Sequence, residues 1–199
     1  MVLALITPPT EEPLTLTEAK LHLRLAVTTA QAVNYPHEDA LLSRLISSVR
    51  EQAEGETWRR FITQTWDYYL DSWPDERFIR IPNPPLQSAS LYYSIDGDSP
   101  AETEFTDIDT DIYSTPGRLV LQRSATWPVG TLIPSNGIRI RLRCGYGTAD
   151  DVPIGLKAAL LIMLSDLYEN RGSVIVGTNV TRITRIVDNL LNPFRANRL

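Results

Sequence analysis

The sequence predicts an α+β protein that is mainly an α-helical bundle, formed by N- and C-terminal helices, with a β-rich insertion between them. Apolar residues recur at helical spacing towards both ends of the chain, and short aromatic and β-branched segments fill the middle. Since helices bury an apolar face by packing on one another, the two helical ends should meet in space. We therefore expect a discontinuous helical domain over residues 1–62 and 150–199, and an inserted β-rich domain over residues 63–149.

The N-terminal part should contain an extended arm and two helices. Prolines at positions 8, 9 and 13 mark the arm. Thr15 and Glu18 have the spacing of a capping box, so a short helix should run from there to about Leu25. Asp39 could cap a longer helix that ends near Arg59, because apolar residues repeat there at steps of three and four.

The middle of the chain should form strands. The segment from Ile138 to Cys144 is the clearest, since apolar and basic residues alternate along it. Prolines at positions 82, 84 and 85 separate strands, because proline cannot lie in the middle of a sheet. The other expected strands cover residues 65–70, 78–81, 90–95, 112–113 and 118–121.

The C-terminal part should be helical again. Residues 156–168 are almost wholly apolar, and a helix of this kind must be buried on nearly every side. A second subunit could supply some of that cover. Residues 172–181 contain two glycines and are expected to be a flexible connection. A last helix should cover residues 181–191 and end before Pro193.

The composition excludes several classes of protein. With 199 residues, 43% of them hydrophobic, and a net charge of −5, the chain is neither fibrous nor disordered. Cys144 is the single cysteine and there are two histidines, which excludes a disulfide framework and a cysteine-rich metal site. No apolar run is long enough to span a bilayer and no secretory signal is present. We expect a soluble protein of a reducing compartment, with no membrane partner.

Motifs for catalysis are absent from the sequence. There is no phosphate loop, nucleophile elbow or zinc-protease motif. Asp107, Asp109 and Asp111 would share one face of a strand, but the glycine and glutamate of a calcium loop are missing. We expect no enzyme activity, no catalytic residues, no metal site and no cofactor.

Charge is distributed unevenly. Of 19 basic residues only Lys20 and Lys157 are lysine, and the rest are arginine. Arginine is enriched at protein interfaces, although a GC-rich genome would produce the same bias. Residues 96–111 hold seven acidic residues and no basic one, whereas residues 151–199 carry a small positive charge. The acidic stretch is either a solvated loop or a surface that repels DNA phosphate.

Three arginines form a ladder on one strand face: Arg139, Arg141 and Arg143. Like charges at this spacing repel unless acidic groups face them. One interpretation is a solvated face crossed by acids of the neighbouring strands; the others are a salt-bridge seam between subunits and a contact with passing DNA. The aromatic strands offer a different hypothesis, a carbohydrate-binding or hydrolytic module, against ordinary sheet packing. Its residues would be Trp66, Tyr68, Tyr69, Tyr92 and Tyr93.

Seven segments, spread over nearly the whole chain, resemble one protein family in the family's order. The family is the head–tail connector (adaptor, or head-completion) proteins of tailed bacteriophages and prophages, also found in gene transfer agents. Cys144 stands where the family usually has a small residue such as alanine, and Phe194 where it has tyrosine. The segments are EPLTLTEAKLHLR (12–24), DALL (39–42), ITQTW (62–66), PNPPLQS (82–88), CGYG (144–147) with VP (152–153), LYENR (167–171) and LLNPFR (190–195).

The resemblance implies a structural protein without catalysis. Members of this family are expected to form twelve-fold rings beneath the portal of a DNA-filled head, as a conduit to the tail. The implied partners are further copies of the chain, the portal protein, a downstream neck or tail protein, and double-stranded DNA passing nearby without sequence recognition. The implied location is the virion neck, after assembly in the bacterial host cytoplasm. Another neck or tail-completion protein remains an alternative.

The resemblance also suggests interaction residues. The C-terminal helix and tail would engage the portal, while two other groups of residues would lie at subunit interfaces or in the lumen. The portal candidates are Arg182, Arg185, Leu190, Leu191, Pro193, Phe194 and Arg195. The interface or lumen candidates are Arg139, Arg141, Arg143, Tyr168 and Arg171.

Overall fold

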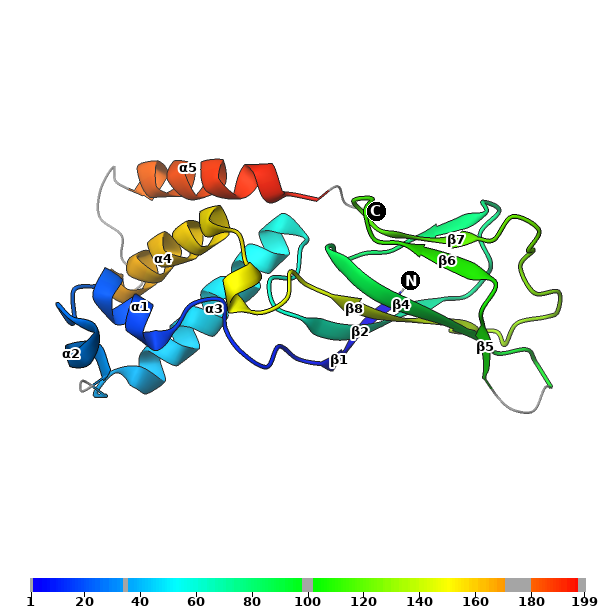
Figure 1. Ribbon diagram of the computed structural model, residues 1–199, viewed down its shortest axis with the longest axis horizontal. Helices are drawn as coiled ribbons and strands as arrows, with labels where there is room; N and C mark the ends of the chain where they lie inside the picture. The colour runs from blue at the N-terminus through cyan, green and yellow to red at the C-terminus, as the bar shows by residue number, and fades with distance from the viewer. Residues whose placement is uncertain (1, 34–35, 98–101, 171–179, 197–199) are drawn as a thin grey trace. The chain divides into compact units, whose positions relative to one another are not determined.

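The computed structural model describes residues 2–33, 36–97, 102–170 and 180–196, without the side chains of residues 180–184. The chain divides into two compact units. The sheet unit comprises Met1–Thr10, Thr63–Tyr146 and Ala196–Leu199, and the helical unit comprises Glu11–Ile62 and Gly147–Arg195. Figure 1 shows the strands of the first and the helices of the second.

The sheet unit contains two antiparallel sheets. The larger sheet has five strands in the order β1-β2-β8-β4-β5, so the first strand of the chain lies at one edge. The smaller sheet has three strands in the order β3-β7-β6. The strands are β1 (Val2–Thr7), β2 (Gln64–Leu70), β3 (Phe78–Arg80), β4 (Leu86–Tyr93), β5 (Thr103–Phe105), β6 (Ile108–Asp111), β7 (Arg118–Leu121) and β8 (Ile138–Cys144).

The two sheets share one apolar core. Strand β8 buries Ile138, Ile140 and Leu142, as its alternating sequence predicts, and turns its arginines to the other face. Residues of both sheets contribute to the same cluster of buried side chains, which shows that the sheets pack face to face. The cluster consists of Tyr68, Ile79, Ile81, Leu86, Leu91, Leu119, Ile138, Ile140 and Leu142.

The helical unit is built around two long helices, α3 (Asp39–Thr57) and α4 (Ile154–Glu169). Helix α4 contacts α3 and also α5 (Val180–Leu191), and α1 (Leu16–His22) lies against both α3 and α4. The remaining elements are short: α2 (Thr29–Val33), η1 (Ala149–Asp151) and η2 (Asn192–Phe194). Figure 1 shows α4 running beside α5 and α3.

Local signals in the helical unit have mixed outcomes. The capping box before α1 is confirmed: the Thr15 hydroxyl accepts from the Glu18 amide at 3.1 Å, and the Glu18 carboxylate accepts from the Thr15 amide at 2.7 Å. The prediction that Asp39 caps α3 is wrong, because Glu38 occupies the cap position and Asp39 pairs with Lys20. The Lys20 ammonium, buried in α1, also donates to the Ala32 carbonyl and so ties α2 to α1.

Helix α4 is apolar on most of its surface but not buried on every side. Leu156, Leu160 and Leu164 are fully buried, whereas Ile154 is 85% exposed and Leu167 is 36% exposed. The expected complete burial is therefore not reached within one copy of the chain. The residue range of the expected flexible connection, 172–181, lies almost wholly outside the described residues.

The predicted fold class is wrong in its main statement. The chain is not mainly a bundle of terminal helices; it is a mixed fold in which two antiparallel sheets form a compact unit of their own. The first residues also join the five-stranded sheet as β1, where an extended arm was expected. Helical periodicity is a local signal, whereas the sheets depend on pairings between distant segments such as β2 with β8, so the sequence shows the helices more clearly than the sheets.

Candidate interaction surface

The outer face of the five-stranded sheet carries the three predicted arginines, and we call it the arginine face. Arg139, Arg141 and Arg143 lie on it because the alternation of β8 turns every second side chain away from the core. Antiparallel pairing places Asp67 of β2 directly opposite Arg141, and Tyr92 of β4 directly opposite Arg139. Side chains from three strands therefore meet on this face.

Asp67 holds two of the arginines together. Arg141 donates from Nε to Asp67 Oδ1 and from Nη2 to Asp67 Oδ2, each at 2.9 Å, and Arg139 Nη1 adds a longer contact of 3.4 Å. Only 3% of the Asp67 side chain is exposed. Burial by itself would raise the pKa of Asp67, but the hydrogen bonds and charges of Arg141 and Arg139 outweigh burial and lower it. Asp67 is therefore a stable anion between two cations.

Arg139 has a second carboxylate and an aromatic neighbour. Its Nε and Nη2 atoms each donate to Glu102 at 2.7 Å, a bidentate pair. Its guanidinium carbon lies 4.3 Å from the centre of the Tyr92 ring. Hydrogen bonding to Glu102 is the main cause that raises the pKa of Arg139, against burial, and it also lowers the pKa of Glu102. The guanidinium of Arg139 therefore already has its hydrogen-bond and charge partners within the chain.

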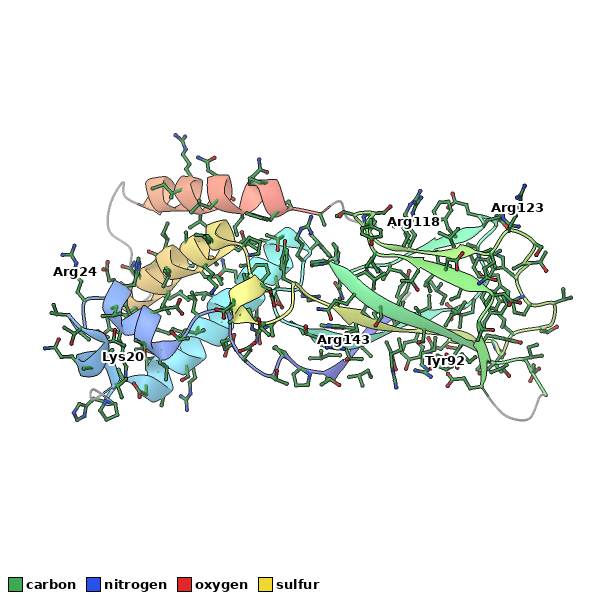
Figure 2. All side chains as sticks on the ribbon, in the orientation of Figure 1. Lys20, Arg24, Tyr92, Arg118, Arg123 and Arg143 are labelled. Carbon is green, nitrogen blue, oxygen red and sulfur yellow. The ribbon has the colours of Figure 1, made fainter. Side chains whose placement is uncertain are left out.

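Arg143 differs from the other two. It is exposed, and its neighbours across the sheet are Thr65 and Ser88, which carry no charge. Arg143 forms no ion pair with any residue that the structure describes. Figure 2 shows Arg143 and Tyr92 on the same side of the five-stranded sheet. Of the three predicted arginines, Arg143 is the one whose guanidinium remains available to a partner.

The C-terminal segment contacts its own helical unit. Val187 and Leu191 are buried, Arg59 Nε donates to the Phe194 carbonyl, and a side chain at Gly155 would meet the Phe194 ring at 3.2 Å. Arg195 pairs with Asp188 at 2.8 Å. Part of the predicted portal group is therefore used to hold the segment in place.

The other predicted residues are scattered. Arg185 and Pro193 are exposed and Leu190 is half-buried. Tyr168 donates a hydrogen bond from its hydroxyl to Glu38. The Arg182 side chain and all of Arg171 lie outside the described residues. The arginine face belongs to the sheet unit, and the C-terminal group belongs to the helical unit. The structure therefore does not bring the two predicted groups together in one site.

Some residues of the arginine face were not singled out from the sequence. Asp67 and Glu102 are the acids that satisfy Arg139 and Arg141, and they come from segments more than 35 residues distant. The alternation of β2 around Asp67 was a usable signal, because it places a lone carboxylate on the polar face. The interpretation that acids of neighbouring strands cross the ladder applies to these two arginines, while a role at a subunit seam or in DNA contact stays a prediction.

Two other chemistries receive no support from the described residues. Three of the five aromatic residues proposed for carbohydrate binding are already engaged within the chain: Tyr68 is buried, Tyr92 lies under Arg139, and Tyr93 packs edge-on against Trp73 at 5.8 Å. Within the described ranges, no group of three or more histidine, cysteine or acidic side chains could hold a metal ion. None of the described helices has the combined length and apolar character needed to cross a bilayer.

Comparisons with known proteins give a structural match and no sequence match. No protein-family model matches the chain, and no curated protein matches it. A chain in the neck of an empty gene transfer agent (GTA) particle, computed with C6 symmetry, superposes with a TM-score of 0.79 at 21% identity. A chain in the virion of a native GTA particle gives 0.78 at 20%, and one in the neck of a native GTA particle with C12 symmetry gives 0.69 at 18%. Each match covers 100% of this chain and 97% of the other, so the fold is shared over its whole length.

Proposed function

We propose that this protein is a structural subunit of the neck of a phage-like particle, in which copies of the chain form a closed ring. The observation that carries the proposal is the likeness of the whole chain, both units included, to chains of GTA necks and virions. A match restricted to one unit would fit many functions, since folds are shared by unrelated proteins. The proposal assigns the chain no catalytic step and places it at the head–tail junction.

Two surfaces fit a ring of identical subunits. In a closed ring each subunit uses two different surfaces, one for each neighbour. Arg143 offers an unsatisfied guanidinium on the arginine face, and Ile154 and Leu167 leave apolar area of α4 uncovered. In a single copy the exposed apolar area is unfavourable and the arginine has no ionic partner. At an interface the apolar area is buried and the arginine can pair. We place subunit contacts at these two surfaces.

Finer assignments are also part of the proposal. The ring would contain twelve copies, dock beneath the portal, contact a downstream neck or tail protein, and surround DNA without reading its sequence. The exposed Arg185 and Pro193 are the members of the C-terminal group best placed for a portal contact, because Leu191 and Phe194 already pack on the chain itself. We also propose that the expected helical domain corresponds to the helical unit and the expected β-rich domain to the sheet unit, apart from residues 1–10, which belong to the sheet unit.

Ring formation is the test. The purified protein, alone and with the portal protein of the same particle, is examined by native mass spectrometry and negative-stain imaging. We expect closed rings, and we expect Arg143→Glu to reduce them. Arg123→Glu is the matched control, since Arg123 is also exposed in the sheet unit and its side chain pairs with no described residue. A protein that stays monomeric at all concentrations, even with portal present, contradicts the proposed function; equal loss of rings in both variants contradicts the role of Arg143.

A further inference from the structure

The smaller sheet of the sheet unit stops short of the larger one. Strand β3 is the end strand of the three-stranded sheet and is hydrogen-bonded to β7 on one side. Tyr68 and Leu70 of β2 line the same groove as Phe78, Ile79 and Arg80 of β3, so the two strands border one groove. The five-stranded sheet continues beyond β2 to its end strand, β1.

The uncovered part of the larger sheet is apolar. Leu3 and Leu5 of β1 lie opposite Tyr68 and Trp66 in the pairing with β2, and opposite residues of antiparallel strands point to the same face. Since Tyr68 belongs to the core, Leu3 and Leu5 are on the inner face. They are nevertheless 36% and 46% exposed. They leave apolar area of the sheet unit open to a strand that a partner supplies.

The free edge of β3 can accept such a strand. Arg77 accepts a bond from the Leu121 amide at 2.9 Å, and the Ile81 amide donates to Gly117 at 2.8 Å, so the odd-numbered positions face β7. In an antiparallel pair the next residue turns both backbone groups the opposite way. The amides and carbonyls of Phe78 and Arg80 therefore point away from β7, and they bond to none of the described residues.

A groove of about 320 Å³ lies along this edge. Most of its walls are apolar, from Tyr68, Leu70, Trp73, Phe78 and Ile79. Trp73 is held by stacking on Trp127, with 5.0 Å between the ring centres. Its indole N–H is buried and has no acceptor among the described residues. The hydroxyl of Tyr68, a residue that is 2% exposed, likewise has no partner in the described part of the chain.

We propose that the edge of β3 is a docking site for an extended segment of a partner protein, which adds to the smaller sheet as a fourth strand. Unpaired backbone groups select an extended chain, and the apolar groove along β3 selects apolar side chains at alternate positions. The unpaired Trp73 N–H would donate to a carbonyl or side-chain oxygen of the partner, because a buried donor without an acceptor is unfavourable. The site involves the sheet unit alone and does not depend on ring formation.

The test uses the full-length protein and a fluorescein-labelled peptide, Ser-Val-Thr-Leu-Thr-Val-Ser, which alternates apolar and polar residues. The control peptide carries proline in place of both threonines and cannot pair as a strand. We expect the first peptide to bind at least about tenfold more tightly by fluorescence anisotropy, and to slow amide exchange at Phe78 and Arg80. Equal affinity for the two peptides, or no binding by either up to about 1 mM, overturns the proposal.

Two variants at one position separate backbone pairing from side-chain contact. Arg80→Pro removes the outward amide and leaves the bonds to β7 in place, because proline is tolerated on an edge strand whose N–H faces solvent. Arg80→Ala removes the guanidinium and keeps the amide. We expect Arg80→Pro to lose about tenfold in affinity and Arg80→Ala to lose no more than about threefold. Equal affinities of the two variants for the first peptide contradict strand addition. If Arg80→Pro fails to fold, the comparison of the two peptides on the wild-type protein still tests the proposal.

Discussion

Asp67→Asn should destabilise the sheet unit by removing the anion between two arginines. The substitution keeps the size of the side chain and removes its charge. It weakens two charge-assisted hydrogen bonds from Arg141 at 2.9 Å and one longer contact from Arg139. It also leaves two neighbouring cations on one strand face without the charge that separates them.

The size of the effect follows from exposure. Hydrogen bonds to charged groups contribute about 1.5–3 kcal/mol each in favourable cases. Arg141 is 48% exposed, so solvent screens its pair and the contribution must be reduced. Arg139 keeps its bidentate pair with Glu102. We therefore expect a loss of about 2 kcal/mol in the free energy of unfolding, or a fall of about 4–8 °C in Tm for a chain of this size.

The pH dependence provides a second measurement. The pKa of Asp67 is lower in the folded chain than in the unfolded chain, where it is about 3.9. The stabilisation is therefore complete above the unfolded pKa and is lost as pH falls through the folded pKa. The difference between wild type and Asp67→Asn should be constant near neutral pH and should shrink only below about pH 4.

Urea denaturation, followed by tryptophan fluorescence, measures the difference at several pH values. Asp75→Asn is the matched control, because Asp75 is an exposed carboxylate of the same unit with no partner in the described residues. A loss for Asp67→Asn no larger than the loss for Asp75→Asn would refute the reasoning. So would a difference that persists unchanged to the pH at which the wild-type protein unfolds.

Two further substitutions test the helical unit. Lys20→Met should lower the free energy of unfolding by about 2 kcal/mol and speed the proteolysis of α2, because it leaves the buried Ala32 carbonyl and Asp39 without the ammonium that binds both. An unchanged rate of proteolysis would show that other contacts hold α2. Gly147→Ala should cost about 1–3 kcal/mol by urea denaturation, because Gly147 has a φ of +140° and an added Cβ would collide with the Asp151 carboxylate that accepts from Thr148; a neutral result would mean that this carboxylate moves without cost.

The sequence predicted those elements whose formation depends mainly on neighbouring residues in the chain. The alternation of residues 138–144 predicted β8, and the spacing of Thr15 and Glu18 predicted the capping box; both are confirmed. Strand β1 was missed because its exposed edge carries apolar residues on both faces, so the chain shows no alternation there. An edge strand of this kind is recognised by its partner β2, about 60 residues away, and not by its own sequence.

For the arginine face, too, the sequence predicted the local pattern but not the contacts between distant segments. The ladder of three arginines was visible in the sequence, but which arginine is free could not be predicted. That property depends on Asp67 and Glu102, whose positions are fixed by pairing between distant strands and by the chain around β5. The prediction of contacts at the C-terminal residues likewise left out two contacts within the chain: Gly155 lies close to the Phe194 ring, and Arg59 donates to the Phe194 carbonyl.

The excess of arginine over lysine has a partial explanation inside the chain. Arg139 and Arg141 each donate two parallel N–H groups to one carboxylate, and lysine cannot form such a bidentate pair. Arg118 also donates from two nitrogens, Nε and Nη2, but both bonds go to the same Oδ2 atom of Asp111. These arginines have partners within the chain, so their number is no argument for a second protein. Whether a partner is expected at a given arginine depends on whether its guanidinium is already satisfied, and on the arginine face that criterion selects Arg143.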